Sequence, residues 1–159
     1  MNNRIIYYYQ TFDSLQPILK QNPIAPTHIH LSSFHFGKIN NKPYIHLNDN
    51  EPTSHVFSTV WSEIKQLYEK NIIIMFMLGG AGGAFTELFS DFETYYGLFK
   101  QTIELYPYCH GIDLDVEEEV DINNIIMLIK RIKKDFGDSF KINNPQSKSS
   151  CGCGVSFSL

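Results

Sequence analysis

The densest group of chemically capable side chains lies in residues 111–117, which read Gly-Ile-Asp-Leu-Asp-Val-Glu. Side chains alternate across a β-strand, so Asp113, Asp115 and Glu117 are expected on one face and the apolar residues between them on the other. Carboxylates held this close oppose each other's ionisation, so one of them can keep a proton near neutral pH and act as a general acid. The spacing therefore predicts acid–base chemistry at the carboxyl end of a strand.

The acids that follow the triplet have a simpler interpretation. Glu118, Glu119 and Asp121 come directly before an amphipathic segment. Acidic residues favour the first turn of a helix because its amino terminus carries partial positive charge. We therefore assign these three to a solvated helix terminus and keep the alternating triplet as the candidate site.

The elements that must position the triplet alternate between strand and helix. Residues 72–78 form a continuous apolar run, as expected of a parallel strand covered on both faces. Residues 53–70 have apolar positions at helical spacing, and residues 38–52 are typical of a loop or small hairpin. The other predicted strands are 5–9, 27–36, 108–116 and 140–142, and the other predicted helices are 14–21, 86–106 and 122–136. This order predicts an α/β fold with a parallel sheet and right-handed crossovers.

Composition narrows the class of function. Lys plus Arg number 13 and Asp plus Glu number 17, a net charge of −4 without a basic block, so nucleic acid is not an expected ligand. The chain has 43% apolar residues, enough for a core, yet no run near the ~20 that a membrane helix needs. No signal-peptide core is visible, so an intracellular location is the default expectation.

Cysteines, glycines and histidines offer weaker candidates. Cys109, Cys151 and Cys153 form no disulfide framework, and the last two lack partner ligands for zinc. The glycine cluster at residues 79–83 is not followed by the Lys-Ser/Thr of a phosphate loop, so a tight strand-to-helix turn is the preferred interpretation. His28, His30 and His35 have the chemistry of metal ligands, but packing is the preferred role, and no metal or cofactor is predicted.

The triplet and its surroundings resemble glycoside hydrolase family 18, the family of chitinases and endo-β-N-acetylglucosaminidases. The family's fourth barrel strand reads Asp-Gly-x-Asp-x-Asp-x-Glu, and residues 110–117 here read His-Gly-Ile-Asp-Leu-Asp-Val-Glu. Residues 77–80, Met-Leu-Gly-Gly, resemble the family's Ser-x-Gly-Gly, and residues 27–34 and 7–10 resemble its second and first strands. Met77 and His110 depart from the pattern. The resemblance covers about residues 4–142.

The resemblance implies a partial (β/α) TIM-type barrel of about four βα units over residues 1–142. A complete barrel needs eight strands and ~250 residues. Residues 143–159 show no strand or helix period, so we expect a disordered or aberrant tail there, as in a truncated or frameshifted product. An open sheet edge would also permit self-association.

The resemblance further implies hydrolysis of β-1,4-N-acetylglucosamine polymers by a substrate-assisted, retaining mechanism, with chitin or its oligosaccharides as ligand. Glu117 would be the general acid, Asp115 would orient the acetamido group, and Asp113 would set the ionisation of Asp115. Substrate contacts are expected at Gly79 and Gly80 and, by stacking of sugars on aromatic rings near strand ends, at Tyr9 and Phe34.

Two other functions use the same residues. The chain would be a non-catalytic carbohydrate-binding protein or an inactive remnant if the incomplete barrel cannot turn over substrate, although retention of Glu117 argues against a lectin. The carboxylates would also suit a divalent cation such as magnesium or calcium.

Overall fold

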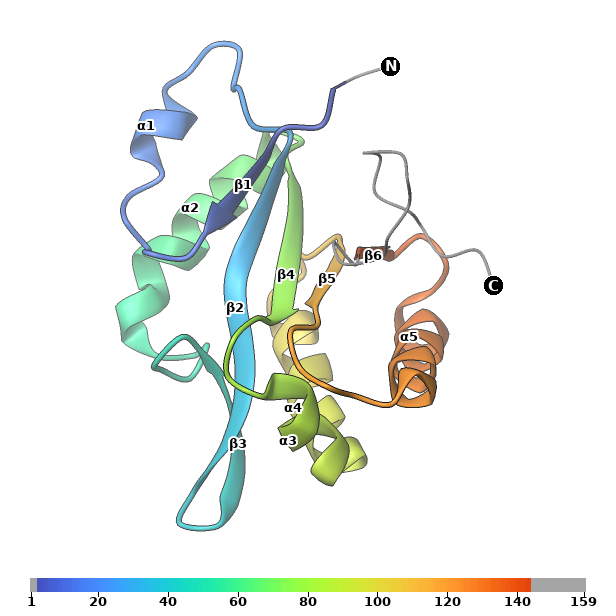
Figure 1. Ribbon diagram of the computed structural model, residues 1–159. Coiled ribbons are helices and arrows are strands. Elements are labelled where there is room, and N and C mark those ends of the chain that lie inside the picture. The colour runs from blue at the N-terminus through green and yellow to red at the C-terminus, as the bar shows by residue number, and fades with distance from the viewer. Residues whose placement is uncertain (1–2, 144–159) are drawn as a thin grey trace.

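The computed structural model describes residues 3–143, which form a curled half-barrel of parallel strands with helices around it (Figure 1). The strands run in the order β1-β2-β4-β5-β6, and β3 pairs with β2 alone. They are β1 Ile6–Tyr9, β2 His28–Ile39, β3 Lys42–Leu47, β4 Ile73–Gly79, β5 Gly111–Asp115 and β6 Lys141–Asn143. The helices are α1 Gln16–Leu19, α2 Ser58–Glu69, α3 Ala84–Ser90, α4 Phe92–Leu105 and α5 Ile122–Phe136, with a 3₁₀ turn at His55–Phe57. The predicted α/β fold, a partial TIM-type barrel, is confirmed.

The two faces of the sheet have different characters because side chains alternate along each strand. Every second residue of β4, namely Ile74, Phe76 and Leu78, belongs to the hydrophobic core beneath the helices. The Phe76 ring lies 5.8 Å from that of Trp61 on α2. The residues between them, Met75 and Met77, are buried but lie outside this core cluster. The opposite face is therefore the barrel interior, where polar side chains gather.

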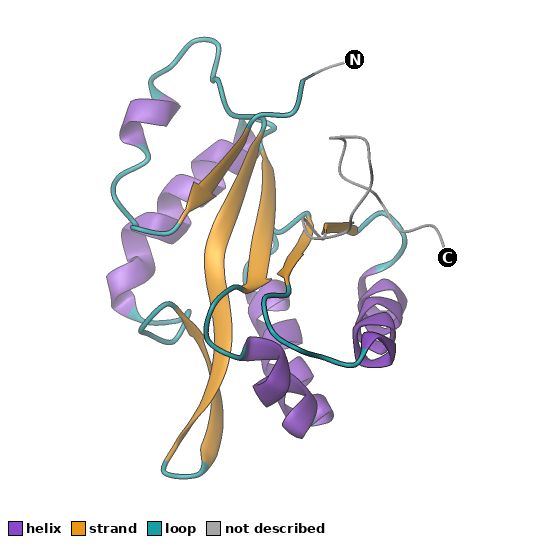
Figure 2. Ribbon diagram, viewed as in Figure 1, coloured by secondary structure: helices purple, strands orange, loops and turns teal. Residues whose placement is uncertain are grey.

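Several elements differ from the sequence prediction at their ends. The helix predicted over residues 86–106 is two helices, α3 and α4, which break at Asp91 where φ is −152°. Strand β2 does not stop at Gly37 but continues into a hairpin through Asn40 and Asn41, both with positive φ, as a two-residue turn requires. The helix predicted at residues 122–136 has the same bounds as α5. Figure 2 shows that the hairpin extends beyond the rest of the sheet.

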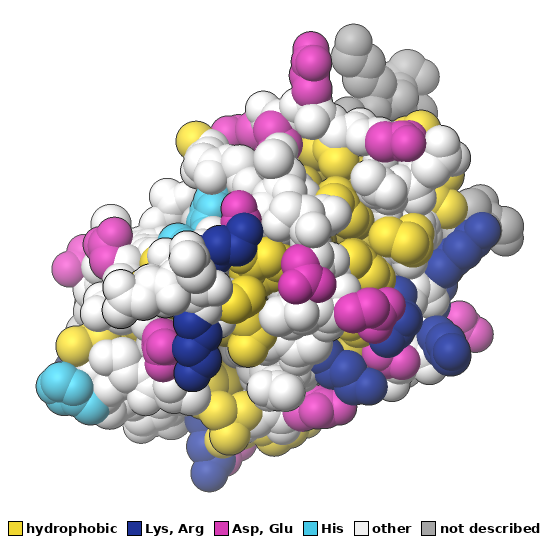
Figure 3. All heavy atoms as spheres, turned by 90° about the horizontal axis from the view of Figure 1, so that it is seen from below, with side chains coloured by type: hydrophobic (Ala, Val, Ile, Leu, Met, Phe, Trp, Pro, Cys, Tyr) yellow, Lys and Arg dark blue, Asp and Glu magenta, His cyan; other side chains and the backbone are white. Residues whose placement is uncertain are grey.

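Two surface properties bear on function. In the face shown in Figure 3, acidic and basic side chains are interspersed around apolar ones, and no continuous basic surface forms there. Within residues 3–143, no helix combines the length and apolarity needed to cross a membrane.

Candidate active site

The triplet lies at the carboxyl end of β5, where the motif glycine has a packing role. A Cβ atom on Gly111 would lie 2.1 Å from the Lys141 carbonyl oxygen, so only glycine lets β6 pair closely with β5. Ile112 and Leu114 are fully buried on the helix side. Asp113 therefore points into the barrel interior, as alternation predicts.

Asp113 lies at the bottom of the site, inside the protein. It has no exposed surface, yet its carboxylate has three hydrogen-bond donors. Oδ2 pairs with His30 Nδ1 at 2.7 Å and accepts from the Tyr8 hydroxyl at 3.3 Å, while Oδ1 accepts from the Asn143 amide at 2.7 Å. Burial of an unpaired carboxylate would be costly, and these partners, from three other strands, offset that cost.

Asp115 lies above Asp113 and packs against the glycine turn. It is half-buried, and burial, followed by the charges of Glu117 and Asp113, raises the pKa of its carboxyl group. Its carbonyl oxygen accepts a hydrogen bond from the Gly80 amide at 2.7 Å. A Cβ atom on Gly79 would lie 2.3 Å from the same oxygen. The structure therefore brings Gly79 and Gly80 directly against Asp115.

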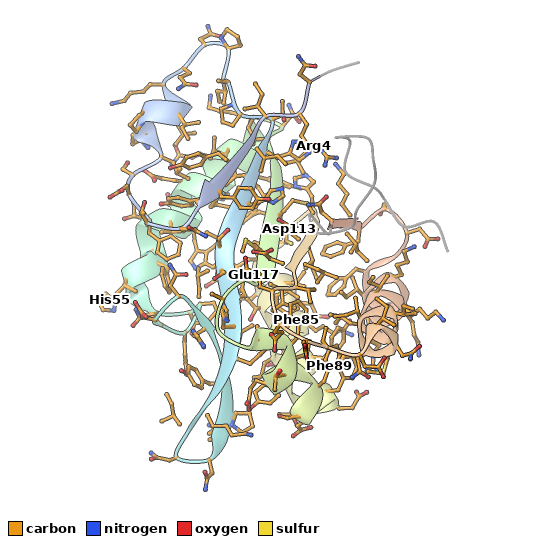
Figure 4. The ribbon with its side chains drawn as sticks, in the orientation of Figure 1. Arg4, His55, Phe85, Phe89, Asp113 and Glu117 are labelled. Carbon is orange, nitrogen blue, oxygen red and sulfur yellow. The ribbon has the colours of Figure 1, made fainter. Side chains whose placement is uncertain are left out.

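Glu117 lies two residues beyond the end of β5 and is exposed. Its charge contributes to the raised pKa of Asp115. Figure 4 shows Glu117 between buried Asp113 and Phe85 of α3. The site thus runs from a buried carboxylate, through a half-buried one, to an exposed one.

Tyr8 is a site residue that the sequence analysis did not select. It pairs in register with His30, and its ring lies edge-on to that imidazole at 4.9 Å. Burial, the charge of Asp113 and the hydrogen bond to it, and the charge of Asp115 raise the pKa of Tyr8 to about 12. Because side chains alternate along β1, Tyr8 faces the barrel interior and Tyr9 faces the hydrophobic core. This alternation is the sequence signal that favours Tyr8 over Tyr9 as a site residue.

Tyr9 and Phe34 lie in the core rather than at the site surface. Tyr9 is 1% exposed, and its hydroxyl donates to the Asp13 carbonyl at 2.8 Å. Phe34 is fully buried and stacks on Phe76 at a centroid distance of 4.9 Å. Stacking of a sugar on either ring would require that ring to leave these partners.

Among the acids after the triplet, Asp121 lies at the start of a helix as predicted, but the assignment of Glu118 is corrected. The cap of α5 is Asp121, which accepts from the Asn123 amide at 2.9 Å, and α5 has no acidic residue in its first turn. Glu118 instead accepts hydrogen bonds from the Phe85 amide at 2.7 Å, the Thr86 amide at 2.9 Å and the Thr86 hydroxyl. It joins the loop after β5 to the start of α3, a contact that local sequence does not reveal.

The histidines have separate roles. His30 pairs with Asp113, His35 stacks against His46 at 5.7 Å, and the Nδ1 atom of His110 accepts from the Ile74 amide at 3.0 Å. Among residues 3–143, no three His, Cys, Asp or Glu side chains converge as a metal site would need. Cys151 and Cys153 lie outside the described residues.

Asn143 belongs to the site, although residues from 143 onward were expected to form a tail. It is the last residue of β6, and its amide binds Asp113.

A cavity of about 480 Å³ lies away from the carboxylates, at the amino-terminal end of the strands, where Arg4, His28 and Lys141 line it. The carboxylates therefore define the candidate site, and the cavity does not.

Known proteins provide the remaining evidence. No protein-family model and no curated protein sequence matches the chain. Among solved structures, the chain is similar to chitinase ChiC from Aspergillus fumigatus, with 34% identity and a TM-score of 0.81, over 90% of this chain and 54% of that one. It is also similar to a fungal endo-β-N-acetylglucosaminidase from glycosyl hydrolase family 18, with 31% identity and a TM-score of 0.78, over 89% of this chain and 54% of the other. The chain spans about half the length of these two proteins.

Proposed function

We propose that the carboxylate site serves the hydrolysis of β-1,4-linked N-acetylglucosamine polymers. The premise is that the chain is a partial glycoside hydrolase family 18 barrel, which corresponds to the N-terminal half of a complete one. The observation that carries the proposal is the graded set Asp113, Asp115 and Glu117, in which the middle carboxyl has a raised pKa and the outer one is exposed. The names of the similar structures, a chitinase and an endo-β-N-acetylglucosaminidase, support the substrate class.

In the proposed reaction, Glu117 acts as the general acid and gives a proton to the glycosidic oxygen while the bond from that oxygen to the anomeric carbon breaks. The carbonyl oxygen of the substrate's own acetamido group attacks the same carbon, so no protein nucleophile is needed. Water then opens the cyclic intermediate and returns a proton to Glu117, which leaves the anomeric configuration retained. Asp115 holds the acetamido N–H, and the three donors on Asp113 keep that residue in place beneath it.

The first test is Glu117→Gln, with the exposed neighbour Glu119→Gln as the matched control. Isothermal titration calorimetry and cleavage assays would use N-acetylated and deacetylated oligomers. We expect Glu117→Gln to keep oligomer binding and lose hydrolysis by at least about 100-fold, since the amide cannot donate as an acid. Glu119→Gln should behave as the wild type. Equal cleavage of deacetylated oligomers would contradict the substrate-assisted mechanism.

The alternative function is carbohydrate binding without turnover. The fact that favours it is that the chain spans only 54% of each similar structure. Oligomer binding without cleavage by the 159-residue chain would support this alternative. Robust cleavage by the same chain would exclude it.

A further inference from the structure

Glu117 lies between two residues that are both tied to the segment after β4. On one side, the carbonyl oxygen of Asp115 accepts a hydrogen bond from the Gly80 amide at 2.7 Å. On the other side, the Glu118 carboxylate accepts from the amides of Phe85 and Thr86 at 2.7 and 2.9 Å. The backbone of Glu117 therefore spans a short stretch with an anchor at each end.

The second anchor exists because α3 lacks a local cap. The residue before α3 is Gly83, which has φ +74° and no side chain that can accept from the first helical amides. These amides need acceptors from elsewhere. Glu118 supplies them from 32 residues away in sequence, and a carboxylate is a stronger acceptor than a neutral oxygen. The hydroxyl of Thr86 adds a third donor to the same carboxylate.

We propose that Glu118 is a positioning residue for Glu117. By binding the first amides of α3, it fixes the path of the loop after β5 and hence the point from which Glu117 reaches the glycosidic oxygen. Small displacements of a catalytic group reduce rates strongly, because proton transfer needs the donor within hydrogen-bond reach. The proposal rests on the proposed function for the role of Glu117, but the anchoring itself is independent of activity.

The test measures the hydrogen bonds of Glu118 and the position of Glu117 separately. Nuclear magnetic resonance on the full chain would give amide hydrogen exchange at Phe85 and Thr86 and the backbone order parameter at Glu117. In Glu118→Ala we expect exchange at both amides to become about tenfold faster or more, from the loss of charge-assisted hydrogen bonds. The order parameter at Glu117 should fall. Glu118→Gln, which keeps a neutral acceptor, should be intermediate, and Glu119→Gln should match the wild type.

Kinetics supply the second readout. Glu118→Ala should lower kcat on N-acetylglucosamine oligomers with little change in KM, because the acid is displaced while the sugar contacts remain. If the wild-type chain has no turnover, the proposed hydrolysis fails for this chain, and the resonance measurements still decide the role of Glu118. Unchanged exchange and order in Glu118→Ala, or an equal effect of Glu119→Gln, would overturn the proposal.

If Glu118→Ala does not fold, two milder variants take its place. Glu118→Gln retains an acceptor, and Thr86→Val removes only the hydroxyl donor. Each should speed exchange at Phe85 and Thr86 and lower the order parameter at Glu117, more weakly than the alanine variant. Wild-type values in both variants would overturn the proposal.

Discussion

At the scale of single residues, the site depends on how Asp113 is held. Its face of β5 follows from the alternation of residues 111–117, and that much was predictable from the sequence. Its partners were not, since Tyr8, His30 and Asn143 lie 105, 83 and 30 residues away in the chain. Only the order of strands in the sheet brings them together.

This arrangement predicts the effect of His30→Leu. The variant removes the 2.7 Å partner of a carboxylate that has no exposed surface, so the carboxylate loses a strong donor inside the protein. We expect the free energy of unfolding to fall by about 2 to 4 kcal/mol. Urea titration followed by circular dichroism would measure it. His55→Leu, at an exposed position away from the site in Figure 4, should change it by less than about 0.5 kcal/mol, and equal losses would refute the argument.

Gly79 gives a second prediction at this scale. Its φ is +103°, and a Cβ atom there would lie 2.3 Å from the Asp115 carbonyl oxygen and 2.6 Å from the Phe85 ring. Gly79→Ala should therefore destabilise the fold by more than about 2 kcal/mol, through strain and displacement of β5. Gly97→Ala is the matched control, because Gly97 lies inside α4 with open space around it. Thermal unfolding should show stabilisation by about 0.5 to 1 kcal/mol for that control.

At the scale of elements, the sequence prediction and the structure differ most at the ends of helices. The bounds of α5 follow from its apolar period and from Asp121 as cap, both of which are local signals. The start of α3 has no such signal, since Gly83 occupies its cap position without a side-chain cap. At the start of α1, the local Ser14 hydroxyl accepts from the Gln16 amide at 3.2 Å. Both helix starts also use a glutamate from elsewhere in the chain: Glu63 accepts from the Leu15 amide before α1, and Glu118 accepts from the Phe85 amide in α3.

Glu63 provides the test for α1. It is 4% exposed on α2 and accepts from the Leu15 amide at 2.7 Å, the Ser14 hydroxyl at 2.8 Å and the Gln16 side chain at 3.2 Å. Glu63→Ala should cost about 1 to 3 kcal/mol, because it leaves a buried amide without an acceptor. Equilibrium urea unfolding would measure this. Glu69→Ala on the same helix, with only a weak pair to Lys65 at 3.9 Å, should cost far less, and a comparable loss there would contradict the role of Glu63.

At the scale of the whole molecule, the prediction of strands and helices in alternation holds because hydrophobic period and turn residues are local. The family motif also located the carboxylates, since it is contiguous. What the sequence could not indicate was burial: Tyr9 and Phe34 are near strand ends, but core packing encloses both rings. Asn143 lies in a stretch with no period, and it joins the site only through the pairing of β6 with β5.

Three histidines make the stability of the molecule depend on pH. Burial lowers the pKa of His28 to about 4 and lowers that of His35 and His110. The folded state therefore binds fewer protons than the unfolded chain, where histidine titrates near ~6.5. Stability is fully present above that value and is lost as pH falls towards 4.

Thermal unfolding at pH 7.5, 6 and 5 would measure this dependence. We expect the unfolding midpoint to fall across the series, and His28→Gln to reduce the fall, because glutamine has no proton to gain. A midpoint that stays constant or rises as pH decreases would contradict the assignment. At pH 5 and above most carboxylates stay ionised, so the histidines dominate the change in proton binding, with Asp115, whose pKa is raised, as the exception.

The hydrogen bonds that Glu63 and Glu118 accept from distant helix starts also bear on the order in which the chain folds. The bond from Leu15 to Glu63 closes a loop of 48 residues, and the bond from Thr86 to Glu118 closes one of 32. Helix α3 has no side-chain cap in its own sequence, and the Leu15 amide before α1 needs Glu63. Both acceptors arrive only when distant segments have docked. These helices are therefore expected to form after the folding transition state. Loss of either glutamate would then speed unfolding and leave the folding rate almost unchanged, so the caps contribute mainly to the lifetime of the native state.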